Sequence, residues 1–178
     1  MKYFLEIKRS MDYLSTKNDV VFLGQAVNVP GTAMRNTLVD VREDKLIELP
    51  VAEEMQMGMA IGMSMTGIIP ICIYPRWNFL LLAINQLVNH LDKLKEISDG
   101  KIYSKVIIRT AIGSIRPLDP QAQHTGDFTN SIKSMCKNIN VINISQTEDI
   151  YEAYNFAYNR KDNISSLIVE TADFYNEK

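Results

Sequence analysis

Five side chains able to take part in chemistry follow apolar segments of this sequence: Glu53, Glu54, Arg76, Trp77 and His124. Carboxyl and imidazole groups can donate and accept protons, which is what general acid–base catalysis requires. The two glutamates begin a helical pattern, where the helix dipole favours acids, so an ordinary first-turn role also explains them. The Walker A, GxSxG and HExxH motifs do not occur, and no GxGxxG follows the first apolar segment. The residue types indicate an acidic helix start and a loop histidine, but they assign no reaction.

The pattern along the chain predicts the elements that hold these residues. Short apolar segments alternate with helical patterns, which is typical of a mostly parallel sheet of about six strands covered by helices on both faces. We therefore predict a single three-layer α/β domain over residues 1–178. The expected strands are 20–23, 46–49, 68–74, 105–109, 141–144 and 167–170. The expected helices are 3–17, 52–66, 79–97 and 128–136, followed by one that Ser145 or Thr147 caps and that ends at Asn159.

Strand direction predicts where a ligand would bind. In parallel sheets, ligands lie outside the carboxyl ends of the strands. Those ends fall at residues 24–25, 49–54, 74–79, 110–124 and 145–147, and they include the five side chains above.

Composition narrows the class of protein. The 178 residues are 46% hydrophobic and 22% charged, as in an ordinary globular domain. The 19 basic and 21 acidic side chains leave a net charge of −2, so we expect no nucleic-acid partner. Cys72 and Cys136 lack the spacing of a zinc site or a disulfide framework, and we expect no metal ligands in this chain. No secretory signal is visible at the N-terminus, so we expect a cytoplasmic protein.

One uncharged stretch, from Met55 to Pro75, is long enough to cross a bilayer. Gly67 and Pro70 interrupt it, and polar residues such as Gln56 lie within it. A buried helix followed by a buried strand explains the stretch better than a membrane span.

The middle of the sequence carries a family motif, which reads Leu-Pro-Val-Ala-Glu at 49–53, Gly-x-x-Pro at 67–70, Asn-Phe at 78–79 and Ala-Ile-Asn-Gln at 83–86. It resembles the pyrimidine-binding domain of thiamine-diphosphate enzymes, above all the beta subunit of the 2-oxo acid dehydrogenases and more distantly transketolase. That family has T-P-I-S-E, G-x-x-P, N-F and D-Q in these places. Gln-His-Thr at 123–125 is similar to the family's Q-H-S.

The resemblance implies roles for individual residues. Glu53 matches the catalytic glutamate, which hydrogen-bonds N1′ of the aminopyrimidine and so helps to form the reactive ylid of thiamine diphosphate. Phe79 matches the aromatic residue that packs on the pyrimidine ring, although core packing is compatible with it. His124 matches the loop histidine that reaches the reacting centre.

Three further residues depart from the family. Trp77 and Arg76 differ from the usual residues, and either they shape the pocket or Arg76 is a solvated loop charge. Gln25 follows the first expected strand, where the family often has acids (L-G-E-D-V). Gln25 and Trp77 are expected to contact the cofactor, together with Glu53 and Phe79.

Two family features are missing from this sequence: the G-D-G…N-N motif that holds Mg²⁺ and diphosphate, and a domain after the last expected strand. The resemblance therefore implies a partner chain that carries this motif, holds the Mg²⁺ ion with most of its ligands and shares the active site. The expected assembly is α2β2, with self-association of this chain. The uncharged, Met-rich helix from Met55 to Met65 fits a surface buried between subunits.

The function implied is that of the pyrimidine-domain subunit of a two-component thiamine-diphosphate enzyme. Its substrate would be a small 2-oxo acid, which is decarboxylated or whose acyl or ketol fragment is transferred. Two alternatives stay open: ketol transfer between sugars, as in transketolase, and a non-catalytic assembly or regulatory subunit that retains the fold.

Overall fold

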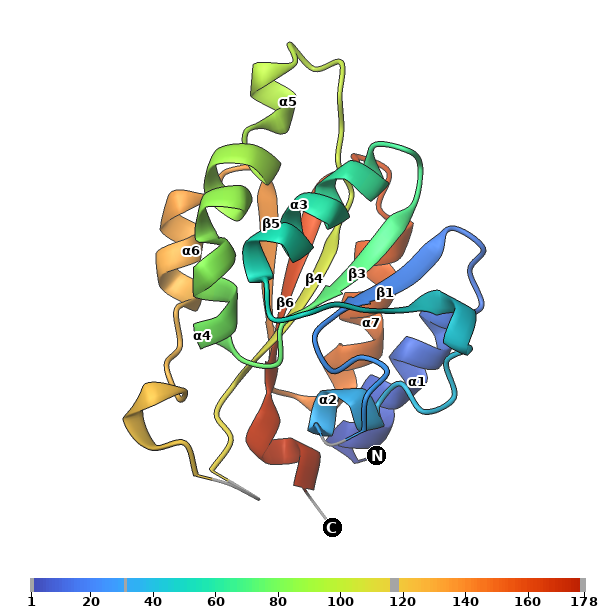
Figure 1. The fold of residues 1–178 in the computed structure, drawn as a ribbon, viewed down its shortest axis with the longest axis vertical. Coiled ribbons are helices and arrows are strands. Elements are labelled where there is room, and N and C mark those ends of the chain that lie inside the picture. Colours follow the sequence, from blue (N-terminus) through green and yellow to red (C-terminus); the bar gives the residue numbers. More distant parts are fainter. Residues whose placement is uncertain (1, 31, 116–118, 177–178) are drawn as a thin grey trace.

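The centre of the molecule is a six-stranded parallel sheet of order β2-β1-β3-β4-β6-β5 (Figure 1). The computed structural model describes residues 2–30, 32–115 and 119–176. The strands are β1 (Val20–Gly24), β2 (Leu46–Glu48), β3 (Ile69–Ile73), β4 (Ile107–Ile112), β5 (Ile139–Ile144) and β6 (Ser165–Thr171). The predicted α/β class is confirmed, and every strand pair within the described ranges is parallel rather than most of them.

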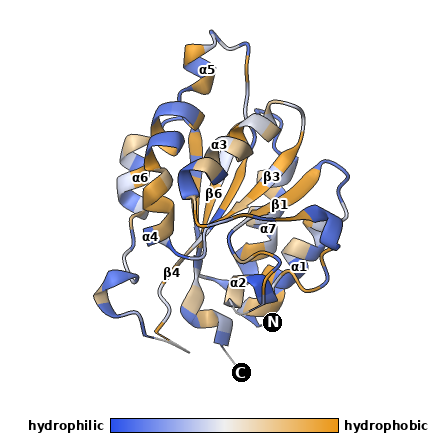
Figure 2. Ribbon diagram, viewed as in Figure 1, coloured by the Kyte–Doolittle hydropathy of each residue, from blue (hydrophilic) through white to orange (hydrophobic). Residues whose placement is uncertain are grey.

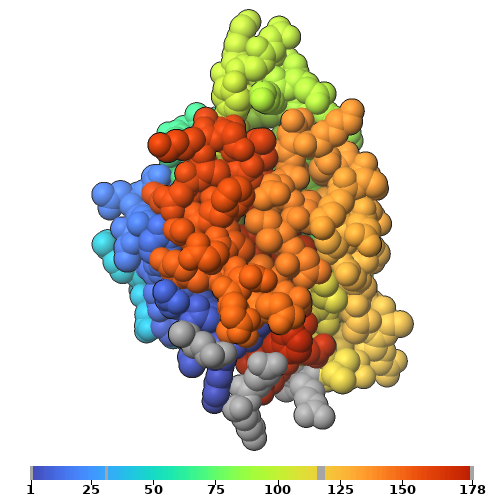
Figure 3. All heavy atoms as spheres, turned by 180° about the vertical axis from the view of Figure 1, so that it is seen from behind, coloured from blue at the N-terminus to red at the C-terminus, as the bar shows by residue number. Residues whose placement is uncertain are grey.

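Helices cover both faces of the sheet. One face packs against α1 (Tyr3–Ser15), α7 (Thr147–Asn159), α2 (Ala33–Asn36) and the 3₁₀ helix η5 (Ala172–Asn176). The other face packs against α3 (Glu53–Ser64), α4 (Trp77–Leu80) and α6 (Thr129–Met135). Two further short 3₁₀ helices are η1 (Glu43–Lys45) and η4 (Gln121–Gln123). Seen from behind, α7 (orange) covers the middle of the molecule and the blue N-terminal segment runs along one side (Figure 3).

Side-chain alternation along the strands divides the core into two clusters. In β4, Ile107 packs in the cluster under α1 and α7, whereas Ile108 packs in the cluster under α3 and α4. This alternation is what a sheet buried on both faces requires, and it explains the nearly continuous apolar strands seen in Figure 2.

The predicted helix over 79–97 is wrong as a single element. The chain instead forms α4, the 3₁₀ helix η2 (Leu81–Ala83), the π-helix η3 (Gln86–Leu91) and α5 (Leu94–Ile97). The end of η3 coincides with a tertiary contact, because its C-cap residue Asp92 accepts hydrogen bonds through Oδ1 from the backbone N–H groups of Lys137 and Asn138 at 2.8 and 2.6 Å. The capping prediction is also wrong: Gln146 is the N-cap of α7 and makes no side-chain capping bond.

A buried ion pair lies in the cluster under α1 and α7. The Arg109 guanidinium donates to both oxygens of Glu170, and both side chains are fully buried. Tyr154 and Tyr175 donate to the same carboxylate, and Arg109 also donates to Thr37 Oγ1 at 2.8 Å. Burial alone would lower the pKa of Arg109, but Glu170, Tyr154 and Tyr175 together outweigh burial, and the pKa lies above its ordinary value.

Sheet order defines one switch point. The chain leaves β1 toward α2, on the face of α1 and α7, whereas it leaves the adjacent β3 toward α4, on the opposite face. Connections that part in this way open a crevice at the carboxyl ends of the two strands, where ligands bind in open α/β sheets.

Candidate functional site

Glu53 is the first residue of α3, the helix that follows β2, and its side chain is nearly buried at 6% exposure. Its Oε1 atom is buried without a hydrogen-bond partner among the described residues. An unpartnered carboxylate oxygen of this kind costs on the order of 1–3 kcal/mol. Such a cost is tolerated most readily at a site that binds a ligand, because the ligand supplies the missing partner.

Two hydrogen bonds fix the first turn of α3 to the end of β3. The Tyr74 hydroxyl donates to the backbone carbonyl of Glu53 at 3.0 Å. Three residues later in α3, the Gln56 side-chain amide donates to the backbone carbonyl of Ile73 at 2.8 Å. Both donors are buried, so they set where Glu53 lies relative to the switch point. Burial, with smaller contributions from Cys72 and Glu53, raises the pKa of Tyr74 well above its ordinary value, which keeps this hydroxyl a donor.

Gln25 follows β1 on the other side of the crevice and is half-buried. It is preceded by Gly24, where a Cβ atom would lie 2.5 Å from the carbonyl oxygen of Ile73 and 3.3 Å from Gln56 Nε2. The loop after it is held by Glu48, whose carboxylate accepts the backbone N–H groups of Ala26, Val27 and Asn28 at 2.6, 2.9 and 2.7 Å. At position 24, only glycine allows β1 and β3 to approach each other as closely as they do.

Phe79 and His124, predicted from distant segments, lie against each other. Their ring centroids are 5.1 Å apart at an interplanar angle of 34°. His124 Nδ1 is buried and has no hydrogen-bond partner among the described residues. Arg76 ties the two segments together, since its Nη1 atom donates to the carbonyl of His124 at 3.1 Å. The alternative of a solvated charge at Arg76 is therefore wrong.

Trp77 is fully buried and packs edge-on against Phe128, with centroids 6.3 Å apart. Its ring belongs to the core under α3 and α4, so in this structure it supports the wall behind the site and has no surface open to a ligand. Its Nε1 atom has no described partner, and the same holds for Asn78 Oδ1 and Gln86 Oε1. Glu54, in contrast with Glu53, is exposed to solvent.

Four residues that hold the site were not singled out for such a role from the sequence: Glu48, Gln56, Tyr74 and, as a clamp, Arg76. All four act on backbone groups. Such contacts leave no motif or spacing in a sequence, although each residue lies within a few positions of a strand end.

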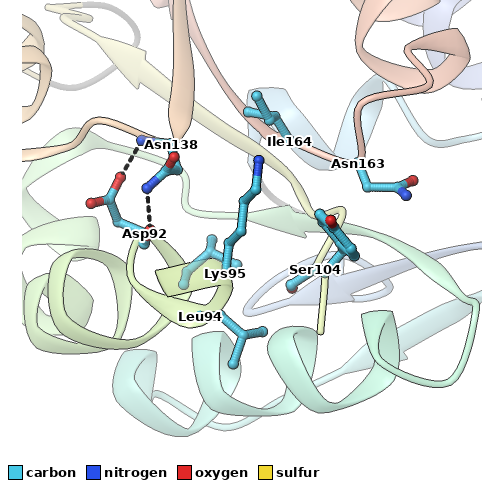
Figure 4. Close-up of a pocket in the computed structure, with 9 residues that line it drawn as sticks. Asp92, Leu94, Lys95, Ser104, Asn138, Asn163 and Ile164 are labelled. Atoms are coloured by element: carbon cyan, nitrogen blue, oxygen red, sulfur yellow. Dashed lines mark hydrogen bonds between the residues drawn. The ribbon is translucent and has the colours of Figure 1, made fainter. Parts of the chain in front are cut away.

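Two hollows lie at the opposite edge of the sheet, where the strands begin. One of about 20 Å³ is lined by residues that include Asp92, Lys95 and Asn163, and it has room for a water molecule (Figure 4). A wider one of about 360 Å³ is lined by residues that include Ser64, Tyr103 and Lys105. Neither adjoins the carboxyl ends of the strands.

Two other kinds of feature are absent from the described residues, a metal-binding cluster and a membrane-spanning helix. Over residues 2–30, 32–115 and 119–176, no group of three or more His, Cys, Asp or Glu side chains is placed to hold a metal ion. No helix in the same ranges is long and apolar enough to cross a membrane.

Fold and site together define a parallel α/β domain with a buried carboxylate and an aromatic–histidine pair at its switch point. The family model described as the transketolase pyrimidine-binding domain matches residues 11–176, and the chain belongs to this family. The resemblance stated from the sequence is thereby confirmed.

Relatives and a solved structure agree with this assignment. The chain is 33% identical over 126 residues to the pyruvate dehydrogenase E1 component subunit beta of Cyanidium caldarium, covering 71% of this chain and 35% of the relative. It is 29% identical over 87 residues to the mitochondrial subunit beta of Caenorhabditis elegans, covering 49% and 24%. A split-gene transketolase, solved as an inactive beta4 tetramer, superposes with a TM-score of 0.73 at 14% identity, over 96% of this chain and 51% of that one. The chain thus spans about a third or less of the length of these curated relatives.

Proposed function

We propose that this chain is the pyrimidine-domain subunit of a thiamine-diphosphate enzyme that acts on a small 2-oxo acid. The observation that carries the proposal is the buried, unpartnered Oε1 of Glu53 at the β1/β3 switch point. A carboxyl group there suits recognition of an aminopyrimidine, because it can hydrogen-bond one ring nitrogen in a site shielded from water.

The residues of the site fit the cofactor. Thiamine diphosphate, when bound, supplies the stabilised carbanion chemistry that amino-acid side chains lack. Glu53 would hold N1′ of its aminopyrimidine and govern the proton there. Phe79, half-buried, would pack on the ring, and Gln25 would border it from the β1 side. His124, which touches Phe79, would handle a proton or the carboxylate of the substrate.

We propose that a second chain with a G-D-G…N-N motif supplies the diphosphate site and most of the Mg²⁺ ligands. The names of the relatives support this division, because they are subunits of a multi-chain component. The outer face of α3 suits the contact, since Met55 and Met65 are 43% and 49% exposed. A Cβ atom at Gly58 or Gly62 on that face would meet nothing within 4 Å. An α2β2 assembly would bury this apolar surface.

The test is calorimetric titration of thiamine diphosphate and Mg²⁺ into the chain alone and into its mixture with the candidate partner. We expect binding only in the mixture, weakened at least tenfold by Glu53→Gln. The matched control is Glu54→Gln, which alters an exposed neighbouring carboxylate and should leave affinity unchanged. A stable complex that binds no cofactor would overturn the proposal and leave an assembly subunit.

The substrate class is tested separately. Turnover of 2-oxo acids by the reconstituted complex supports the proposal, whereas turnover of ketose phosphates alone would favour ketol transfer. For the compartment we propose a reducing one such as the cytosol, because Cys72 and Cys136 are free and buried.

A further inference from the structure

Arg76 joins the two sides of the candidate site through backbone carbonyls. Its Nη1 atom donates to the carbonyl oxygens of Gly113 at 2.9 Å, Ser114 at 3.2 Å and His124 at 3.1 Å. These acceptors come from both ends of the segment between β4 and α6. One half-buried guanidinium therefore gathers three chain positions that are up to eleven residues apart in sequence.

Arg76 is also built into the helix that carries Phe79. It is the N-cap of α4, and its carbonyl accepts the N–H of Phe79 at 3.1 Å. The side chain of Arg76 thus fixes the backbone of His124 while its main chain fixes the backbone of Phe79. The two rings lie next to this double attachment, 5.1 Å apart and tilted by 34°.

The start of the same segment has a second attachment. Asp173, in η5, accepts the N–H of Ile115 at 3.1 Å. Its carboxylate lies so close to Gly113 that a Cβ atom there would be 2.7 Å from Oδ2. The carbonyls of Gly113 and Ser114 are therefore a fixed base, against which Arg76 sets the position of His124.

We infer that Arg76 is a positioning residue that holds His124 over Phe79, and that it acts on the reaction through His124 rather than by touching substrate. The Nη1 atom has two hydrogens, which the three carbonyl oxygens share, and hydrogen bonds from a charged donor are stronger than those between neutral groups, so this contact can fix a loop backbone. This inference rests on the proposed function for its catalytic part, but not for its structural part.

The structural part is tested on the full chain by hydrogen exchange. Arg76→Met should raise the exchange of amides in residues 119–126 at least tenfold, and Arg76→Lys, which keeps a charged donor, should restore much of the protection. Arg42→Met is the matched control, because among the described residues Arg42 pairs only with exposed Asp44 on the surface. Unchanged exchange in Arg76→Met, in a chain that still folds, would overturn the inference.

The catalytic part is tested by a double-mutant cycle in the reconstituted complex. Arg76→Met should lower kcat by roughly 10- to 100-fold, as expected when a reacting group is misplaced. In a His124→Ala background the same substitution should have no further effect, because the group it positions is gone. A merely structural role would instead lower kcat equally in both backgrounds and would contradict the inference. An inactive wild-type complex would count against the proposed function. The hydrogen-exchange experiment would still decide whether Arg76 positions the backbone of His124.

Discussion

On the face of the sheet that α1 and α7 cover, the buried charges of Arg109 and Glu170 are hydrogen-bonded to each other and to Thr37, Tyr154 and Tyr175. On the side of α3 and α4, the buried polar atoms without a described partner include Glu53 Oε1, Trp77 Nε1, Asn78 Oδ1, Gln86 Oε1, Thr110 Oγ1 and His124 Nδ1. On the face of α1 and α7, Glu6 and Asp12 each have one such oxygen as well, but each carboxylate is ion-paired through its other oxygen. Arg35 Nε, in α2, is a further atom of this kind on that face.

This difference separates polar groups that build the fold from those that are available to bind. A buried charge with a complete set of partners gains nothing from a ligand and loses much when one partner is removed. A buried group without a partner already carries its desolvation cost and can recover it by binding. The two sides of the sheet should therefore respond oppositely to substitution.

The largest effect is expected at the ion pair. Arg109→Met leaves the buried Glu170 carboxylate without its counter-charge, and should lower the free energy of unfolding by about 3–5 kcal/mol. Urea denaturation measures it. The double variant Arg109→Met, Glu170→Leu is the control, and it should be less destabilised than Arg109→Met alone. If Arg109→Met lowers the free energy of unfolding by less than about 1 kcal/mol, the buried ion pair does not stabilise the fold as proposed, and the two sides of the sheet do not differ in this way.

Alkaline pH probes the same network through its tyrosines. Burial, followed by the charge of Glu170, raises the pKa of Tyr154 and Tyr175 well above the ordinary 10.0. Their contribution to stability is therefore complete below pH 10 and is lost above it. The loss is about 1.4 kcal/mol per pH unit for each phenol that ionises only on unfolding. Phenolate absorbance should appear together with unfolding, and a gradual rise from the folded protein would contradict this.

A smaller effect is expected at Tyr74, which ties the start of α3 to β3. Tyr74→Phe removes the hydroxyl that donates to the carbonyl of Glu53, and should lower the free energy of unfolding by about 1–2 kcal/mol. It should also weaken cofactor binding by the reconstituted complex, because Glu53 moves. Tyr103→Phe alters an exposed ring and serves as the control. A loss of stability with unchanged cofactor affinity would show that the attachment of α3 to β3 does not affect the cofactor site.

The alkylation rate of the two thiols tests whether water reaches the core under α3 and α4. No change in stability is expected in this experiment. Burial raises the pKa of Cys72 to about 12 and, together with Asp92, that of Cys136 to about 11. At pH 8 the thiolate fraction of either is roughly one in a thousand or less. Alkylation of the native chain should therefore be slow, and fast in denaturant. Rapid labelling of the folded chain would show that water enters this core.

The sequence predicted the parallel α/β class and the approximate position of all six strands, because buried strands are read from short apolar segments. The family resemblance singled out Phe79 and His124 separately, and the structure places their rings next to each other. What the sequence analysis missed depends on tertiary contacts. Within the expected helix over 79–97, the end of η3 coincides with hydrogen bonds to Asp92 from Lys137 and Asn138, just before β5. Local periodicity carries no signal for such a contact.

The roles of charged and polar residues were harder to predict than their places. Arg109 and Glu170 lie 61 positions apart, so their pairing depends on β4 and β6 being neighbours in the sheet. Arg76 read equally well as a solvated charge, since its partners are backbone carbonyls. Trp77 was expected at the cofactor, but side-chain direction after β3 turns it into the core.

The most direct test of the contrast is the free energy of unfolding of Glu53→Gln, measured beside the wild-type chain without cofactor or partner. We predict no loss, or a gain of up to about 1 kcal/mol, because a neutral amide is less costly to bury unpartnered than a carboxylate. A loss of 2 kcal/mol or more would mean that Glu53 holds the fold together. It would contradict the assignment of this carboxylate to ligand binding.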